Sequence, residues 1–531
     1  MGYSEIHCHI CGVSFNISRA RTENEPRSAA WGQESDYPDR FHPECCPNEG
    51  GCFWVDRYAD GDQDAEEPAT ASLEPVKIFP ADIDEDDFEP DDWEHISGPK
   101  CHQGDAYNGH NISIEAMRGC KTSQCLIRKL EDWEPEPDDE EFETSGRFFL
   151  SGLNDFMPSR DMSCPEVVPE RHGNNMPNAD NCVWNADEAE DYCMPFHPTC
   201  FEIFKRASLH RYGVVDIECL TQWWAHEANY EDFHAFPRHP AVENGQQQSW
   251  NHNEGDEFLA ANPCFVPGLE SLLTSAQCPK GLVHADSELI PTAVSTTKNP
   301  TDVFSRLPGE IRMFILLQLG FRDIANLRLT SRTFLQLPRS LFYELTLRDT
   351  PWLYEAWSSL PISYWATSTQ KEEEKKQKDR QDRVAALRSA LEILEDEAVD
   401  SGNPDANDAA IDAIEAELET LSDIPLAPRP AASVMLLKRA ETDWYSLHTE
   451  IGRNWKKMQG LQNRRRIWND CQEILNRVDA YRRQGKIRRG QVVDITAMAR
   501  RADEIQAEKG RRWARYCAAG RQGPYNPEDW A

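Results

Sequence analysis

The segment LPGEIRMFILLQLGFRDIANLRLTSRTF, residues 307–334, marks an abrupt change from an irregular polar chain to a helical one. Apolar side chains recur along its first half at the three- and four-residue spacing of one helix face, and Pro308 suits a first helical turn. Asp323 can cap a second helix, and Pro338 ends the apolar run that follows. Three short helices within about 40 residues bury little core alone, so we expect a partner surface.

The order of these residues resembles an F-box. The match consists of a Leu-Pro start at Leu307, an Asp-x-x-x-Leu step from Asp323 to Leu327, and a Ser-Arg-x-Phe close ending at Phe334. F-box domains are three-helix modules that dock on the Skp-family adaptor of cullin–RING ubiquitin ligases. The resemblance implies adaptor contacts at seven positions, several of which could instead pack the module's own core: Leu307, Pro308, Ile311, Ile315, Leu319, Leu327 and Leu329.

Segments outside this module are similar, more loosely, to F-box proteins of filamentous fungi. The similar stretches are residues 196–204, 337–342, 351–357 and 463–468. Many F-box proteins carry WD or leucine-rich repeats that bind substrates, and the sequence contains neither at its usual period. The resemblance therefore implies a protein substrate whose identity stays open.

Charge is divided unevenly along the 531 residues. The chain carries 56 basic and 92 acidic side chains, a net charge of −36. Residues 1–300 hold 20 basic and 57 acidic side chains, so the acidic excess belongs to this part. Such a balance makes nucleic acid and anionic membranes unfavourable partners. The tail at 451–531 is basic, which indicates a solvated helix face, an intramolecular contact with the acidic part, a nucleic-acid contact or a nuclear import signal.

The cysteines are expected to be reduced. The first residues lack the apolar region of a secretory signal, and no apolar run is long enough to span a bilayer. We therefore expect a cytoplasmic or nuclear protein with no membrane partner. Disulfides are disfavoured there, so the 17 cysteines should be thiols, core residues or metal ligands.

Cys8-His-Ile-Cys11-Gly has the spacing of a zinc knuckle, in which two thiolates take adjacent corners of a tetrahedron. Two His-x-x-Cys pairs could complete it. One pair is His42 and Cys45, and the other is His197 and Cys200.

The second pair is favoured because the pattern of residues 201–209 predicts a helix. His197 and Cys200 would then lie in the first turn of this helix. The candidate cofactor is therefore one structural zinc bound by Cys8, Cys11, His197 and Cys200. The alternative is that these are buried core residues, since free cysteine is often buried. Core packing is also the interpretation of five irregularly spaced cysteines: Cys101, Cys120, Cys125, Cys182 and Cys193.

We predict a mostly α C-terminal part, with a three-helix F-box, a long helical hairpin and a bundle. The N-terminal part is predicted to be an irregular α+β, Cys-rich domain with acidic disordered loops. The predicted divisions are a Cys/His-rich segment (1–57), an acidic disordered loop (58–94), a Cys-containing α+β domain packed with 1–57 (95–228), a polar linker (229–300), the F-box (301–348) and a helical region with a hairpin at about 370–422 and a basic tail (349–531).

Sequence motifs of common enzyme classes do not occur, including phosphate-binding glycine loops, the Gly-x-Ser-x-Gly elbow and His-Glu-x-x-His. We therefore expect a non-catalytic subunit that recruits a protein substrate to a Skp–cullin–F-box ubiquitin ligase. Two alternatives remain at this point: an adaptor-binding protein that acts outside the ligase, and a zinc-containing regulatory protein.

Overall fold

The computed structural model describes residues 5–32, 50–56, 77–79, 93–101, 104–129, 133–135, 139–155, 193–227, 236–246, 250–277, 302–335, 337–401, 408–422, 431–488 and 511. Most of the acidic tract at 58–94 lies outside these ranges, as do His42 and Cys45. No helix within them is both long enough and apolar enough to cross a membrane.

The N-terminal part combines short strands with helices, as predicted. Its described strands are β1 (Arg19–Ala20), β2 (Phe53–Asp56), β3 (Lys77–Ile78), β4 (Trp93–Ile96), β5 (Tyr107–Asn108), β6 (Gln124–Arg128), β7 (Phe148–Leu150) and β8 (Cys193–Phe196). β1 pairs in parallel with β5. Two antiparallel sheets have the orders β3-β2-β4 and β7-β6-β8, each with a buried central strand.

One short helix lies between strands of the second sheet, and the helices that follow this sheet build the core. In chain order these helices are α1 (Glu141–Ser145), α2 (Pro198–Tyr212), α3 (Ile217–Glu227), α4 (Pro240–Gly245), η8 (Glu257–Ala260) and α5 (Leu269–Ala276). The long C-terminal helix α13 (Gln459–Arg483) packs against α2, α3 and η8. Its inward face is apolar and buried, including Ile467, Cys471 and Val478. The same core therefore joins residues from both ends of the chain.

Part of the segment predicted as a polar linker contributes to this core. Residues 236–246 and 250–277 carry buried apolar side chains, among them Trp250, Leu259 and Leu273. The overall polar composition of 229–300 hides this role because strongly polar stretches, such as 243–257, adjoin the apolar run at 258–276. These three side chains nevertheless lie against the core, and the Asn463 amide of α13 donates to the carbonyls of Leu259 and Ala261.

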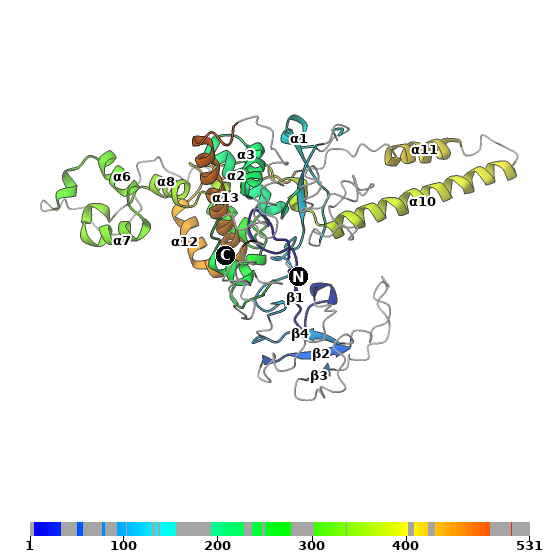
Figure 1. Ribbon diagram of the computed structural model, residues 1–531, viewed down its shortest axis with the longest axis horizontal. Helices are drawn as coiled ribbons and strands as arrows, with labels where there is room; N and C mark the ends of the chain where they lie inside the picture. The colour runs from blue at the N-terminus through cyan, green and yellow to red at the C-terminus, as the bar shows by residue number, and fades with distance from the viewer. Residues whose placement is uncertain are drawn as a thin grey trace.

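The F-box region is helical, as predicted. Its elements are η9 (Val303–Arg306), α6 (Gly309–Leu317), α7 (Phe321–Thr330), η10 (Arg332–Phe334) and α8 (Arg339–Asp349). α8 contacts both α6 and α12 (Trp444–Asn454), and it thereby connects the module to the body. Figure 1 shows α6 and α7 at one extremity of the molecule.

The predicted helical hairpin lies at the opposite extremity (Figure 1). α10 (Gln370–Ser401) and α11 (Asp408–Ser422) run antiparallel, with an ion pair between Arg383 and Glu417 at 2.8 Å. Arg380 also donates to the carbonyl of Leu421. Smaller elements complete the chain: η1 (Arg27–Ala29), η11 (Tyr354–Ala356), α9 (Tyr364–Thr367) and η12 (Trp455–Lys457).

Two arginines of the predicted basic tail are buried rather than solvated. The Arg464 guanidinium donates to both carboxylate oxygens of Glu355, at 2.9 and 3.0 Å. Arg466 donates to Asp470 at 3.2 Å. Further along α13, basic side chains pair with acidic ones of the N-terminal part, in the pairs Arg477–Glu227 and Arg482–Asp216. The basic helix α13 thus contacts the acidic N-terminal part of the same chain, which is one of the interpretations that its positive charge suggested.

Candidate functional site

The Cys8–Gly12 segment forms a tight turn in the core. The Gly12 amide donates to the Cys8 carbonyl at 2.7 Å, and Gly12 has a φ of 73°, a left-handed conformation that favours glycine. The His9 amide donates to the Pro195 carbonyl of β8 at 3.0 Å. The turn is therefore attached to the strand that leads directly into α2.

α2 begins where the sequence predicts. His197 is the residue before its first turn, Pro198 occupies the first helical position, and the Cys200 amide donates to the His197 carbonyl. This turn brings the two side chains to the same side of the helix start. The His197 amide also donates to the Cys8 sulfur at 3.4 Å, so the helix start and the Cys8 turn are in direct contact.

The four residues predicted as metal ligands come together. The ligand atoms of Cys8, Cys11, His197 and Cys200, hereafter the knuckle cluster, all lie within 4.8 Å of one another, and all four residues are buried. His197 Nδ1 lies 3.6 Å from the Cys11 sulfur and 3.8 Å from the Cys200 sulfur. Tetrahedral zinc bonds of about 2.3 Å to sulfur and about 2.0 Å to nitrogen place such atoms about 3.6 Å apart.

The protonation of this cluster depends on its members' proximity. Burial alone would lower the pKa of His197, but the charges and hydrogen bonds of Cys8 and Cys11 raise it to about 10. Burial would raise the pKa of Cys11, yet hydrogen bonds with Cys200, Cys8 and His197 hold it well below its usual value. Burial, together with hydrogen bonds to Cys11 and Cys8 and the charges of these two thiols, raises the pKa of Cys200 well above its usual value.

Three thiols and an imidazole in a dry site cannot all be deprotonated without a cation. The donor set also suits zinc, which prefers thiolate and imidazole ligands. The Nε2 atom of His197 is buried and has no hydrogen-bond partner within the described part of the chain, whereas Nδ1 points to the sulfurs. The residues present therefore fit a metal bound through Nδ1, which would cross-link the Cys8 turn to α2.

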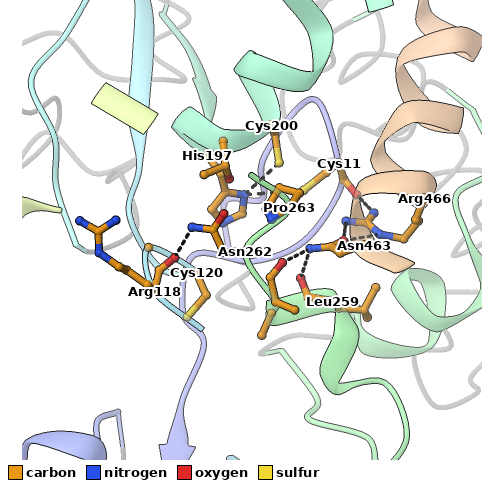
Figure 2. Close-up of a pocket in the computed structure, with 14 residues that line it drawn as sticks. Cys11, Arg118, Cys120, His197, Cys200, Leu259, Asn262, Pro263, Asn463 and Arg466 are labelled. Carbon is orange, nitrogen blue, oxygen red and sulfur yellow. Dashed lines mark hydrogen bonds between the residues drawn. The ribbon is translucent and has the colours of Figure 1, made fainter. Parts of the chain in front are cut away.

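Groups from distant segments hold the backbone of the turn. Arg466 of α13 donates to the Cys11 carbonyl at 2.8 Å, and Arg238 donates to the carbonyls of Ile10 and His9 at 2.5 and 3.1 Å. In Figure 2 Arg466 lies beside Cys11, opposite His197 and Cys200. The cavity next to these residues measures about 20 Å³. Substrate pockets are usually about 300–1,000 Å³, so this arrangement favours a structural role.

The second candidate site is the surface of the F-box region. Five large apolar side chains there are exposed and are called the F-box face: Val303 (69%), Ile311 (45%), Phe314 (64%), Phe321 (42%) and Leu329 (86%). They are five of the twelve exposed large apolar side chains in the described residues, so apolar surface is concentrated on this module. Other apolar side chains of the module are buried, namely Leu316, Ile324 and Phe334.

A carboxylate ties the two ends of the module together. Asp302 accepts hydrogen bonds from the hydroxyls of Ser331 and Thr333, at 2.7 and 2.8 Å, and from the Phe304 amide at 3.1 Å. Hydrogen bonding, first from Ser331, lowers the pKa of Asp302 to about 2. The end of α7 is thereby fixed next to η9.

The seven positions predicted for the adaptor divide into two groups. Pro308, Ile311 and Leu329 are exposed, whereas the other four are half-buried: Leu307, Ile315, Leu319 and Leu327. Leu319 and Leu327 pack partly against the main core. The predicted adaptor contacts did not include Phe314 and Phe321. The second half of α6 is an unbroken apolar run from Met313 to Leu317, and in such a run periodicity does not separate an exposed face from a buried one.

The predicted core cysteines are also of two kinds. Cys125 and Cys193 are fully buried in the main core, and Cys120 is half-buried beside it. Cys182 lies outside the described residues. Cys101 instead lies with two other possible ligands, in a cluster that no motif spacing indicated.

Comparisons with known proteins agree with the F-box prediction. The family model of the F-box domain matches residues 304–343, which confirms the resemblance there. A mitochondrial ATP-dependent RNA helicase, mss116, from Aspergillus oryzae is 34% identical over 67 residues, which are 13% of this chain and 11% of that protein. The chain thus spans about a tenth of that relative, too little to carry its activity over. No solved structure matches the chain.

Proposed function

We propose that this chain, which carries an F-box domain at residues 304–343, is a substrate-recruiting subunit of a Skp–cullin–F-box ubiquitin ligase. An F-box is a protein–protein interaction module, and the typical partner of such a module is a Skp-family adaptor that links it to cullin. In this proposal the chain itself is non-catalytic and acts in the cytoplasm or the nucleus.

The observation that carries the proposal is the F-box face. Exposed apolar side chains are unfavourable in water, and their concentration on one module indicates an interaction surface. Ile311, Phe314 and Leu329 lie on α6 and α7, the helices of the matched module, whereas α8 is turned toward the body with Leu341 and Leu345 fully buried. The module therefore exposes apolar side chains of α6 and α7 and attaches to the protein through α8.

The attachment of the module supports a tethering mechanism. α8 packs on α12, which packs on α5, and these helices share the core with α13. A substrate bound to the body would be held at a defined distance from the adaptor. Such positioning raises the rate of ubiquitin transfer by proximity, without catalytic groups on this chain. The knuckle cluster, with zinc bound, would stabilise the body that positions the substrate.

A reconstitution experiment tests the proposal. Full-length wild type is mixed with purified Skp-family adaptor and cullin, and complexes are isolated by size-exclusion chromatography. Wild type should recover both partners, whereas Ile311→Asp/Leu329→Asp should recover neither, because each carboxylate would be buried in an apolar contact. Ile393→Asp is the matched control, since Ile393 is 56% exposed on α10, far from the module (Figure 1).

Each outcome is informative. Recovery of both partners, lost only in the F-box variant, supports the proposal. Adaptor without cullin would show that the chain acts outside the ligase. Absence of both from wild type would refute adaptor docking altogether.

A further inference from the structure

The sheet β3-β2-β4 carries a second cluster of metal-ligand side chains. The ligand atoms of Cys52, His95 and Cys101, hereafter the sheet cluster, all lie within 4.8 Å of one another. The residues are 2%, 0% and 6% exposed. The Cys101 sulfur lies 3.9 Å from His95 Nε2, close to the separation of about 3.6 Å that a shared tetrahedral zinc would impose.

Strand pairing and one tight turn bring these residues together. In the antiparallel register Trp54 lies opposite His95 and Phe53 lies opposite Ile96. Cys52, the residue just before β2, therefore lies beside the end of β4. The Cys101 amide donates to the Gly98 carbonyl at 3.1 Å, which turns the chain back toward Cys52. The backbone is packed closely here, because a Cβ atom added to Gly98 would lie 2.0 Å from the carbonyl oxygen of Gly50.

The Gly98 amide points at a sulfur. It donates to the Cys52 sulfur at 3.4 Å, the same distance as the contact between the His197 amide and Cys8 in the knuckle cluster. Backbone N–H groups that donate to cysteine sulfur favour the thiolate, the form that binds metals. Both clusters therefore combine thiols, an imidazole and an amide directed at sulfur.

Apolar packing around this sheet is small. Among the described residues, one side buries Cys52, Trp54 and Cys101, and the other side buries Phe53, Val55 and Ile96. Neither group belongs to the main core of the described residues. Small sheets with so little buried apolar area usually need a metal or another cross-link for stability.

We infer that Cys52, His95 and Cys101 bind a second metal ion of the zinc class, separate from the knuckle cluster. Two thiolates and one imidazole disfavour magnesium, calcium and manganese, which prefer oxygen ligands. Three protein ligands leave a fourth coordination position for a water molecule or another donor. The bound metal would fasten the start of β2 to the turn that follows β4. This inference does not depend on the F-box proposal.

The first test is the metal content of full-length protein purified under reducing conditions, measured by mass spectrometry. Wild type should contain about two zinc ions per chain, one for each cluster. Cys52→Ser/Cys101→Ser and Cys8→Ser/Cys11→Ser should each lose one of them. Cys125→Ser is the control, because Cys125 is fully buried in the core and belongs to neither cluster.

The second test includes a variant, His95→Cys, that should keep the metal site intact. Cobalt replaces zinc in such sites, and the intensity of its thiolate charge-transfer band follows the number of bound sulfurs. Wild type offers five, three from the knuckle cluster and two from the sheet cluster. Cys52→Ser/Cys101→Ser should therefore lose about two fifths of the band, while His95→Cys should retain the metal and gain intensity.

Specific results would overturn the inference. These are one zinc per wild-type chain that disappears only with the knuckle variant, two zinc ions retained by Cys52→Ser/Cys101→Ser, or a Cys52–Cys101 disulfide in place of metal. Zinc at the sheet cluster without adaptor binding would support the inference and refute the F-box proposal, so the two are tested separately.

Discussion

Replacing Leu329 by alanine should separate adaptor binding from stability. Leu329 lies in the last turn of α7 with 86% of its surface exposed, so its side chain contributes little to the folded chain alone. The change removes three carbon atoms, and burying each of them is worth about 0.8 kcal/mol. Multiplied by the exposed fraction of the side chain, this gives about 2 kcal/mol of binding free energy lost when the adaptor covers Leu329. The affinity should fall about 30-fold.

The assay measures both quantities on the same samples. Isothermal titration with purified adaptor gives Kd, and urea unfolding gives the free energy of unfolding. Leu329→Ala should change the latter by less than about 0.5 kcal/mol. Ile324→Ala, on the same helix but only 4% exposed, should instead lose about 2–5 kcal/mol of stability. Ile393→Ala should alter neither adaptor affinity nor stability appreciably.

The reasoning would be refuted if wild type binds the adaptor and Leu329→Ala binds it within twofold of wild type. A large loss of stability in Leu329→Ala would equally contradict the exposed position of this side chain. The first result would mean that the F-box face is not the docking surface.

Three further predictions concern the body. Arg464→Met should lower the free energy of unfolding by about 3–5 kcal/mol, because it leaves the buried Glu355 carboxylate unpaired, and Arg464→Met/Glu355→Leu should recover part of this in urea unfolding. Burial lowers the pKa of His252 to about 4, so the free energy of unfolding should fall as the pH drops below about 6.5, the pKa of an unfolded histidine. Between pH 7 and pH 5 the free energy of unfolding of wild type should decrease by about 2 kcal/mol more than that of His252→Asn. A zinc chelator should lower the Tm of wild type and of Cys125→Ser by more than that of Cys200→Ser, which has already lost the metal of the knuckle cluster.

Local signals made parts of the fold predictable. The F-box is specified by residues close together in sequence, from Leu307 to Phe334, and its helices follow from their spacing. The pairing of the Cys8 turn with His197 and Cys200 could also be predicted from the sequence, because Pro198 and the apolar run after it place both side chains at the start of a helix. A short-range pattern was thus available for each half of the knuckle cluster.

Other features depend on long-range packing that no local pattern encodes. Cys52 and His95 meet only through the register of β2 and β4, two four-residue strands that polar sequence separates. The burial of Arg464 and Arg466 was missed because a run of arginines normally indicates solvent. Here the guanidinium groups find a carboxylate and backbone carbonyls inside the protein, which offsets the cost of their burial.

The contact between Arg466 and the Cys11 carbonyl has a consequence for synthesis on the ribosome. The two residues are 455 positions apart, and translation at about 5–20 residues per second makes the second available about 20–90 s after the first. Throughout that interval the nascent N-terminal part lacks the helix that covers it. Native closure of the body must therefore wait until α13 has been made, and a chain released before that point would leave the apolar surface of α2 and α3 open to chaperones and proteases.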